Sequence, residues 1–240
     1  MNPLRLAVLA CSLAVLPLRA QEPAAPSPAI HEVSPGIFEI GQLRLDQKAR
    51  TVTFPATVNK TGADDLLEYL LVNSDGQTHE SLLLTTVPPT DLHFAMLLLG
   101  AKGSGDAATK AQESGGGQIN AEFLKRAPKL TGDRIQISAK WKSADGTEQS
   151  APVEDWIFNL DAKQPMTRGP WLYTGSAFIE GKFRAQTEGC FGALVTYPPA
   201  LINNPRKGND RDDIWAVNAK AVPPVDTPLE LLIKIEPTDP

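Results

Sequence analysis

Residues that cross-link a chain are scarce in this sequence. The 240 residues include two cysteines and three histidines. Cys11 lies in an N-terminal stretch that we expect to be removed, which leaves Cys190 as the single thiol. One thiol cannot form a disulfide within the chain, so a buried core must supply the stability. An apolar content of 42 % makes such a core feasible in one domain or in two closely packed halves.

Positive charge is also in short supply. Lys and Arg number 23 against 28 Asp and Glu, which gives a formal net charge of −5. Removing residues 1–20 would take away Arg5 and Arg19 but no acid, and would move the net charge to −7. Nucleic-acid binding requires a concentrated basic face. We therefore expect no nucleic-acid partner.

Long apolar runs are limited to the N-terminus. There Arg5 precedes an apolar run over residues 6–16, and the small residue Ala20 follows shortly after it. This order is typical of a secretory signal peptide with cleavage after Ala20. Lipid attachment at Cys11 is disfavoured, because the apolar run continues past it. A membrane-spanning helix needs roughly 20 apolar residues, so we expect no transmembrane segment and an exported protein, periplasmic or secreted.

The rest of the chain divides by composition into two parts. Residues 21–33 are rich in Pro and Ala and predict an extended leader. Residues 34–240 are expected to form a single domain. Within it, residues 101–118 are rich in Gly, Ser and Ala, with little to bury, which predicts a flexible surface insertion. The spacing of a phosphate-binding loop is absent from that insertion.

Most of the domain has the two-residue periodicity of strands. Apolar and polar residues alternate in 51–58, 134–142 and 228–235, and Asp145-Gly146 favours a two-residue hairpin turn. We therefore predict an α+β, β-rich fold, with antiparallel sheets built from hairpins and one or two short helices.

Helical signals are fewer. Residues 88–100 predict the one clear helix, with Thr90 or Asp91 as its cap and Gly100 as its end. Residues 121–130 offer about two further turns before and around Pro128.

A carboxylate lies in an apolar setting in residues 67–84. If Asp75-Gly76 is a two-residue turn, the paired strands place Glu80 on a face made otherwise of Leu and Tyr side chains. A carboxylate there must be paired or take up a proton, so we expect less than about a quarter of it to be exposed. Glu80 either pairs with a structural donor or, helped by His79 or His93, serves as a metal ligand, proton carrier or ligand anchor.

Amides, carboxylates and cations concentrate in ALINNPRKGNDRDDIWAVN, residues 200–218. Asn203 and Asn204, followed by Pro205, predict a turn locked by hydrogen bonds from side chain to backbone. An EF-hand calcium loop does not fit the spacing, and neighbouring cations disfavour an irregular calcium site. The stretch is either an ordered loop laced with ion pairs or a polar recognition loop. Its candidate ligand-binding residues are Asn203, Asn204, Asn209 and Asp210.

Four segments occur in a specific order: LEYLLVNSDGQTHESLLLTTVPPTDLHFAMLLLG (67–100), GPWLYTGSAF, ALINNPRKGNDRDDIWAVN and AVPPVDTPLELLI. Together they resemble the YdjY domain of exported bacterial proteins, from about residue 34 to the C-terminus. The resemblance implies a domain boundary and an exported location, and little mechanism. The iron–sulfur chemistry attached to some relatives does not transfer, because Cys190 alone cannot replace a four-thiolate ligand set. Residues that match the family's signature are Thr78, His79, Glu80, Ser81, Asn203, Asn204, Pro205, Gly208, Asn209 and Asp210.

No catalytic motif is apparent, whether a nucleophile elbow, a cofactor loop or metal-ligand spacing. Our leading hypothesis is an exported, non-catalytic binding or interaction module, with no cofactor and with a small molecule or an envelope protein as partner. The alternative is a metal-binding protein or metal-assisted hydrolase that uses His79, Glu80 and His93, since catalytic zinc takes three protein ligands. A thiol redox role for Cys190 is disfavoured, because its strand is apolar and a buried thiol is usually inert.

Overall fold

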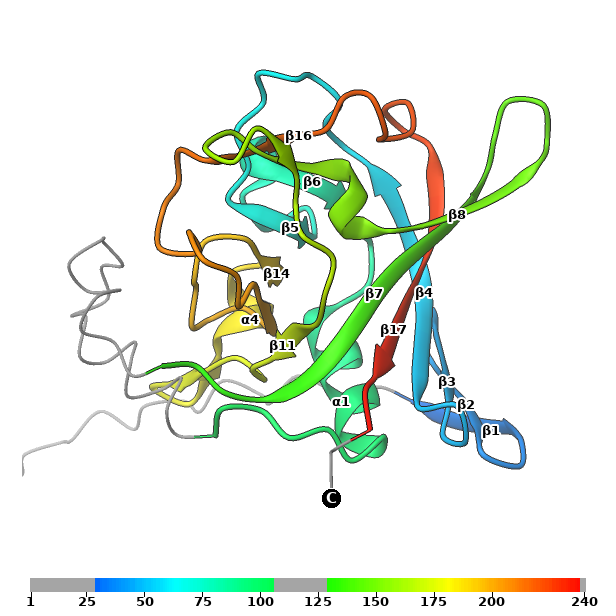
Figure 1. Cartoon of the computed structure of the whole chain (residues 1–240). Coiled ribbons are helices and arrows are strands. Elements are labelled where there is room, and N and C mark those ends of the chain that lie inside the picture. Colours follow the sequence, from blue (N-terminus) through cyan, green and yellow to red (C-terminus); the bar gives the residue numbers. More distant parts are fainter. Residues whose placement is uncertain (1–28, 106–128, 238–240) are drawn as a thin grey trace, which may run out of the picture.

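The structure, a computed structural model, describes residues 29–105 and 129–237. Strands dominate it, and they fall into one large sheet and two small ones (Figure 1). The strands are β1 (Ile30–Ser34), β2 (Ile37–Ile40), β3 (Leu43–Asp46), β4 (Thr51–Val58), β5 (Tyr69–Val72), β6 (Ser81–Leu84), β7 (Asp133–Lys142), β8 (Glu148–Pro152), β9 (Ile157–Asn159), β10 (Gln164–Pro165), β11 (Trp171–Tyr173), β12 (Phe178–Ile179), β13 (Lys182–Phe183), β14 (Cys190–Ala193), β15 (Ile202–Asn203), β16 (Trp215–Val217) and β17 (Pro228–Ile235). The helices are η1 (Thr78–Glu80), α1 (Pro89–Leu98), η2 (Val153–Trp156) and α4 (Arg184–Thr187).

Eight strands of the large sheet close into a barrel. They follow the order β4-β17-β7-β11-β15-β14-β5-β6, and β6 returns to β4 through the pairs Thr57↔Leu84 and Val58↔Leu83. Strands β1, β2 and β3 continue the sheet beyond β4 as a wing, and β8 pairs with one end of β7. The prediction of a β-rich fold with few helices is confirmed. The sequence analysis did not predict that the sheet closes.

Three strands with alternating side chains form one wall of the barrel. In β4 and β17 every second side chain is buried, as the periodicity predicted, and in β7 the alternation holds for Ile135, Ile137 and Ala139, with Trp141 half-buried. The register aligns Phe54, Leu231 and Ala139 at one level and Val52, Ile233 and Ile137 at the next. Burial of one large apolar side chain stabilises the fold by about 1.5–3 kcal/mol relative to exposure. These two levels of buried side chains therefore contribute strongly to the stability of the barrel.

The hairpin predicted across Asp75-Gly76 is wrong, because β5 and β6 run parallel. The amide of Gly76 does bond the carbonyl of Asn73, so a turn is present, but it leads through η1 back to the start of β5. There the amide of Glu68 bonds the carbonyl of Glu80. Strand β5 is buried throughout and β6 nearly so, a pattern typical of parallel strands rather than of a half-exposed hairpin. A second parallel pair joins β14 and β15, so the sheet is not built from antiparallel hairpins alone.

The change of pairing also moves Glu80 out of the apolar face. Glu80 lies in η1 with 35 % of its side chain exposed, and His79 Nε2 lies 3.5 Å from its carboxylate. The expectation of less than a quarter exposed was therefore wrong. Asp145-Gly146 does lie in a hairpin turn, but Ser143 bonds Thr147 across it, so the loop has three residues rather than two.

Helix α1 is confirmed where the sequence predicted it. It begins after Pro88, which serves as N-cap in place of Thr90 or Asp91, and Thr90 instead bonds the side chain of Gln186 in α4. Gly100 follows the helix with φ +74°, a left-handed conformation that suits glycine at a helix end. Leu92, Ala95 and Met96 are buried, and α1 lies near one end of the barrel (Figure 1).

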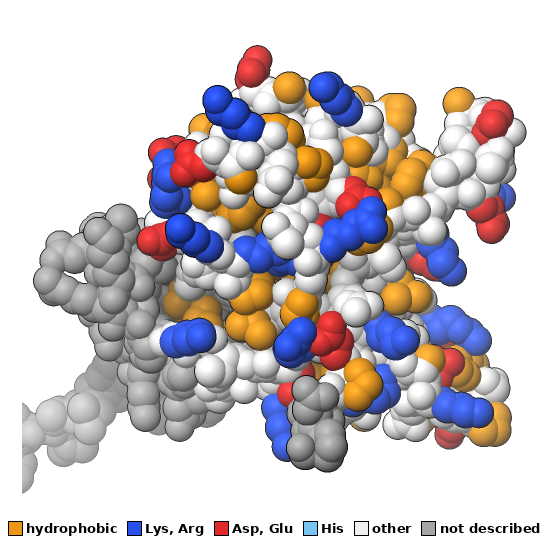
Figure 2. Space-filling view, in the orientation of Figure 1, with side chains coloured by type: hydrophobic (Ala, Val, Ile, Leu, Met, Phe, Trp, Pro, Cys, Tyr) orange, Lys and Arg blue, Asp and Glu red, His pale blue; other side chains and the backbone are white. Residues whose placement is uncertain are grey.

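Several sequence predictions lie wholly or mainly outside the described residues. These are the signal peptide (1–20), most of the leader, most of the insertion at 101–118 and the second helix at 121–130. Within residues 29–105 and 129–237, no helix is long and apolar enough to cross a membrane. On the face shown in Figure 2, Lys and Arg side chains are scattered and several adjoin acidic ones, and the β7–β8 hairpin projects from the body.

Candidate functional site

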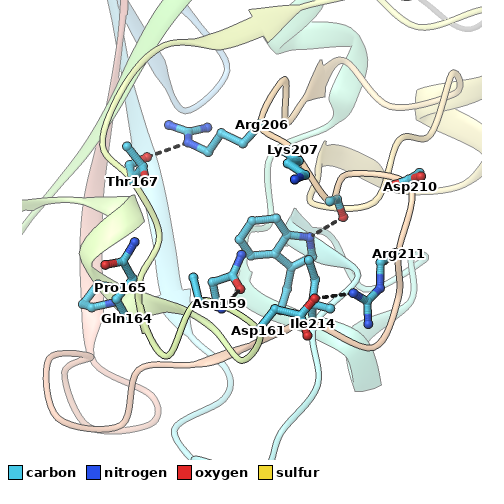
Figure 3. A pocket seen from close by; sticks show the side chains of 13 residues that line it. Asn159, Asp161, Gln164, Pro165, Thr167, Arg206, Lys207, Asp210, Arg211 and Ile214 are labelled. Atoms are coloured by element: carbon cyan, nitrogen blue, oxygen red, sulfur yellow. Dashed lines mark hydrogen bonds and ion pairs between the residues drawn. The ribbon is translucent and has the colours of Figure 1, made fainter.

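A polar pocket of about 700 Å³ opens beside the segment that the sequence singled out. One wall is residues 203–213, here called the 203–213 loop, and the opposite wall is residues 159–167 around the small strands β9 and β10. We call this cavity the loop pocket. Figure 3 shows Arg206 reaching Thr167 at one end and Arg211 reaching Asp161 at the other.

Asparagine side chains hold the 203–213 loop in place, as predicted. The Asn204 amide donates to the carbonyl of Leu194 at 3.0 Å and accepts from the amide of Arg206 at 3.0 Å. The Asn203 side chain accepts from the Tyr197 amide at 2.7 Å and donates to Thr174 Oγ1 at 2.9 Å. Both side chains are almost fully buried. A buried amide left unpaired would cost about 1–3 kcal/mol, so these bonds fix one loop conformation.

Asn209 completes the lock from the far side of the loop. Its side chain donates to the carbonyl of Asn204 at 2.8 Å, and its own carbonyl accepts from the Thr196 amide at 2.6 Å. The side-chain amides of Asn203 and Asn204 are thus engaged with the protein through both oxygen and nitrogen, and Asn209 is engaged through its NH₂ group. These contacts shape the pocket.

A buried ion pair anchors the same loop to η2. Arg206 Nη2 lies 2.8 Å from Glu154 Oε1, and the side chains are 13 % and 4 % exposed. The indole N–H of Trp171 donates to the same carboxylate at 3.1 Å, and the guanidinium lies 5.0 Å from the Trp171 ring centre. Burial raises the pKa of Glu154, against the opposing effects of its own hydrogen bonds and of Arg206. Sequence reasoning did not find this pair, because its partners are 52 residues apart.

The base of the loop pocket is apolar. Ile214 and Trp215 line it and are almost fully buried, and the Trp215 indole donates to the carbonyl of Gly208 at 3.1 Å. Gly208 has φ +90°, and a Cβ there would lie 2.3 Å from Ile214 Cδ1. Only glycine fits this close approach, so the loop can pass directly over the base.

Four polar groups remain available around this base. Within the described part of the chain, Lys207, Asp210 and the Gln164 amide have no side-chain hydrogen bond or ion pair, and all three line the loop pocket. The Asn159 oxygen accepts from Ala162, which leaves its NH₂ group free. Arg211 is neutralised by Asp161 and Asp213. Donors and acceptors therefore face the pocket side by side, with no excess of one charge.

His79, Glu80 and His93 are not brought together as a metal site. His93 Nδ1 lies 2.7 Å from the Tyr173 hydroxyl, its ring packs against Phe183, and burial lowers its pKa. His79 and Glu80 lie on η1, where His79 is 69 % exposed. In residues 29–105 and 129–237, no three His, Cys, Asp or Glu side chains converge in a way that could hold a metal ion.

Glu68 links η1 electrostatically to the loop. Burial raises the pKa of Glu68, the charges of Glu80 and Asp212 raise it further, and His79 lowers it. Two of the segments singled out in the sequence therefore share one electrostatic environment. Sequence reasoning missed Glu68, although it precedes an apolar strand directly, because its acidic neighbours come from distant parts of the chain.

Comparison with known proteins identifies one family. The family model described as the YdjY domain matches residues 43–234. The match begins at the first residue of β3 and ends in β17, so it spans every strand of the barrel. Neither a curated protein nor a solved structure matches the chain.

Proposed function

The chain belongs to the YdjY domain family, and we propose that it is an exported, non-catalytic binding module whose ligand site is the loop pocket. One observation carries the proposal. A loop held rigid by its own asparagines presents Lys207 and Asp210 above an apolar base, and the opposite wall presents Gln164, all three without side-chain partners among the described residues. A preorganised rim of this kind lowers the ordering cost of binding.

The free groups define the chemistry of the ligand. Lys207 and the Asn159 NH₂ group donate, Asp210 accepts, and the Gln164 amide does both. Because neighbouring charges cancel, an anion or a cation gains little, whereas a ligand with donors and acceptors of its own can engage both kinds of group. A sugar or a short peptide has this chemistry. The volume of about 700 Å³ lies within the range of small-molecule sites.

The alternative of a metal-assisted hydrolase has less support. Its three donors would have to converge, but His93 is engaged with the Tyr173 hydroxyl, and the described residues contain no convergent set of three metal-ligating side chains. Export through a signal peptide over residues 1–20 remains part of the proposal, supported by the order of charged, apolar and small residues there. An N-terminus at Gln21 in the processed protein would support it, and an intact Met1 would contradict it.

Calorimetric titration tests the binding site. The probes are disaccharides of glucose and of N-acetylglucosamine, and the dipeptide dialanine. At least one probe class should bind saturably, and Lys207→Ala and Asp210→Asn should each weaken that binding by about tenfold, since hydrogen bonds to charged groups are at stake. Lys220→Ala and Asp64→Asn, exposed residues outside the pocket, serve as matched controls. Equal affinities in all four variants would contradict the assignment of the site.

A further inference from the structure

A second, smaller cavity of about 250 Å³ lies where the turn after β5 meets β14. Its lining includes Tyr69, Tyr197, Cys190, Glu188 and Asp75. We call it the tyrosine pocket. None of its residues lines the loop pocket, so the two cavities are separate sites.

Close backbone contacts make the walls of the tyrosine pocket rigid. The amide of Asn73 bonds the carbonyl of Gly189 at 2.9 Å, and the Asn73 side chain accepts from the Asp75 amide at 3.0 Å. Gly189 has φ +59°, and a Cβ there would lie 2.0 Å from Asn73 Oδ1. The turn that was expected to make a hairpin therefore serves as one wall of a cavity.

Two aromatic rings form the other wall. Tyr69 and Tyr197 meet edge to face, with ring centres 5.8 Å apart and an interplanar angle of 88°. The Tyr197 hydroxyl donates to one oxygen of Glu188, and Arg184 bonds the other oxygen. Glu188 is thereby fixed at the edge of the aromatic wall.

The Tyr69 hydroxyl has no such partner. Tyr69 is 8 % exposed, yet within residues 29–105 and 129–237 its hydroxyl makes no hydrogen bond. It is also absent from the fully enclosed unpaired side-chain atoms, of which the described residues contain only Arg184 Nε, so the hydroxyl must reach open space. The Cys190 thiol, 2 % exposed, likewise has no hydrogen bond there. Buried polar groups are normally paired with protein or water, so the unpaired hydroxyl shows that the Tyr69 side chain borders space that a small molecule can enter.

The surroundings of this hydroxyl are acidic. Burial raises the pKa of Tyr69, and the nearby Cys190, Glu68, Glu80 and Glu188 raise it further. Asp75 adds another carboxylate to the lining, and Arg184 is the one cation bonded to Glu188. The charge balance at the pocket is negative, which favours a cationic occupant over a neutral or anionic one.

We propose that the tyrosine pocket binds a small organic cation, with its ammonium group against the tyrosine rings and facing the carboxylates of Asp75 and Glu188. Cations bind over aromatic faces when they are partly desolvated. The volume equals that of roughly eight water molecules at about 30 Å³ each, which limits the occupant to a compact ammonium compound. A hard metal ion needs six or more oxygen ligands, more than this lining supplies.

The test is calorimetric titration of the full chain with tetramethylammonium chloride. tert-Butanol provides a neutral compound of similar shape, and potassium chloride provides an inorganic cation. Tetramethylammonium should bind saturably at one site, whereas tert-butanol and potassium should not bind. Equal binding of tert-butanol would overturn the proposal, and equal binding of potassium would replace the organic cation by a simple charge effect.

Variants assign the binding to this pocket. Tyr69→Leu removes one ring and should weaken binding by about tenfold, within the range of a cation–π contact. Asp75→Asn removes an exposed charge and should weaken binding by about two- to fivefold, the range of exposed ion pairs. Tyr69→Phe keeps the ring and should stay within about twofold of the parent. Asp64→Asn is the matched control for charge. Tyr69→Leu removes a buried side chain, so Asp75→Asn decides the outcome if Tyr69→Leu fails to fold. Unchanged affinity in both variants would refute the assignment.

Discussion

Two polar segments that look alike in the sequence behave differently in the structure. The 203–213 loop and the turn at residues 73–80 both carry amides, acids and a signature match. In the loop, Asn203 and Asn204 are almost fully buried and bond the backbone of Tyr197 and Leu194. The loop is also anchored by the ion pair of Arg206 with Glu154. In the turn, His79 is exposed and Glu80 is half-buried, and their side chains lie 3.5 Å apart. A polar residue in such a segment is therefore interpretable only once its burial is known.

The largest effect should come from breaking the ion pair under the loop. Arg206→Ala leaves the Glu154 carboxylate buried without its cation, and removal of one partner of a buried pair costs about 3–5 kcal/mol. Urea unfolding followed by tryptophan fluorescence measures the loss. The double variant Arg206→Met, Glu154→Gln should recover part of it, because no isolated charge remains. If Arg206→Ala lowers the unfolding free energy by less than about 1 kcal/mol, the pair contributes no more than a solvent-exposed ion pair, which would contradict the prediction.

A smaller but clear effect should separate the two segments. Asn204→Ala removes the bonds to Leu194 and Arg206 and leaves their buried groups unpaired, at a cost of about 1–3 kcal/mol. Glu80→Ala, in the exposed turn, should change the unfolding free energy by less than about 0.5 kcal/mol. Both follow from denaturant unfolding of the purified variants. Equal losses would remove the distinction between a locked loop and an open turn.

The smallest effect concerns the pH dependence of Glu68. Its folded-state pKa is raised by burial and then by Glu80 and Asp212, so its ionisation opposes folding. The stability present below its ordinary pKa is lost as pH rises through the raised value. Glu68→Gln stays neutral, so its melting temperature should rise relative to the parent as pH increases above the ordinary pKa of a glutamate. Asp64→Asn controls for a general loss of negative charge. If the melting temperature of Glu68→Gln falls relative to the parent as pH rises, the prediction is contradicted.

Strands with one solvent-exposed face could be predicted from the sequence. Strands β4, β7 and β17 alternate, and each lies where that alternation predicted it. Strands β5 and β6 were mispaired because they have little alternation, and their pairing follows from closure of the barrel. The pairing of β4 with β6 and the parallel pairing of β14 with β15 join distant segments, so no pattern in the local sequence predicts them.

The candidate site likewise has one part that the sequence predicted and one part that it did not. Asn203 and Asn204 before Pro205 predicted a locked turn, because short amide side chains bond nearby backbone. The structure adds what spacing cannot give, namely the pairing of Arg206 with Glu154 and the meeting of Tyr69 with Tyr197. These contacts depend on how distant strands lie in the barrel. Local rules therefore find the loop, and only tertiary structure finds the pockets.

The position of β17 controls when this protein can fold. This strand, residues 228–235, is inserted between β4 and β7 and pairs with both along most of its length. The wall of the barrel is therefore open until residue 235 has been synthesised, and contacts between such distant segments form slowly. A nascent chain lacking its last strand exposes the edges of β4 and β7. Closure of this wall therefore comes after every other strand of the barrel has been made.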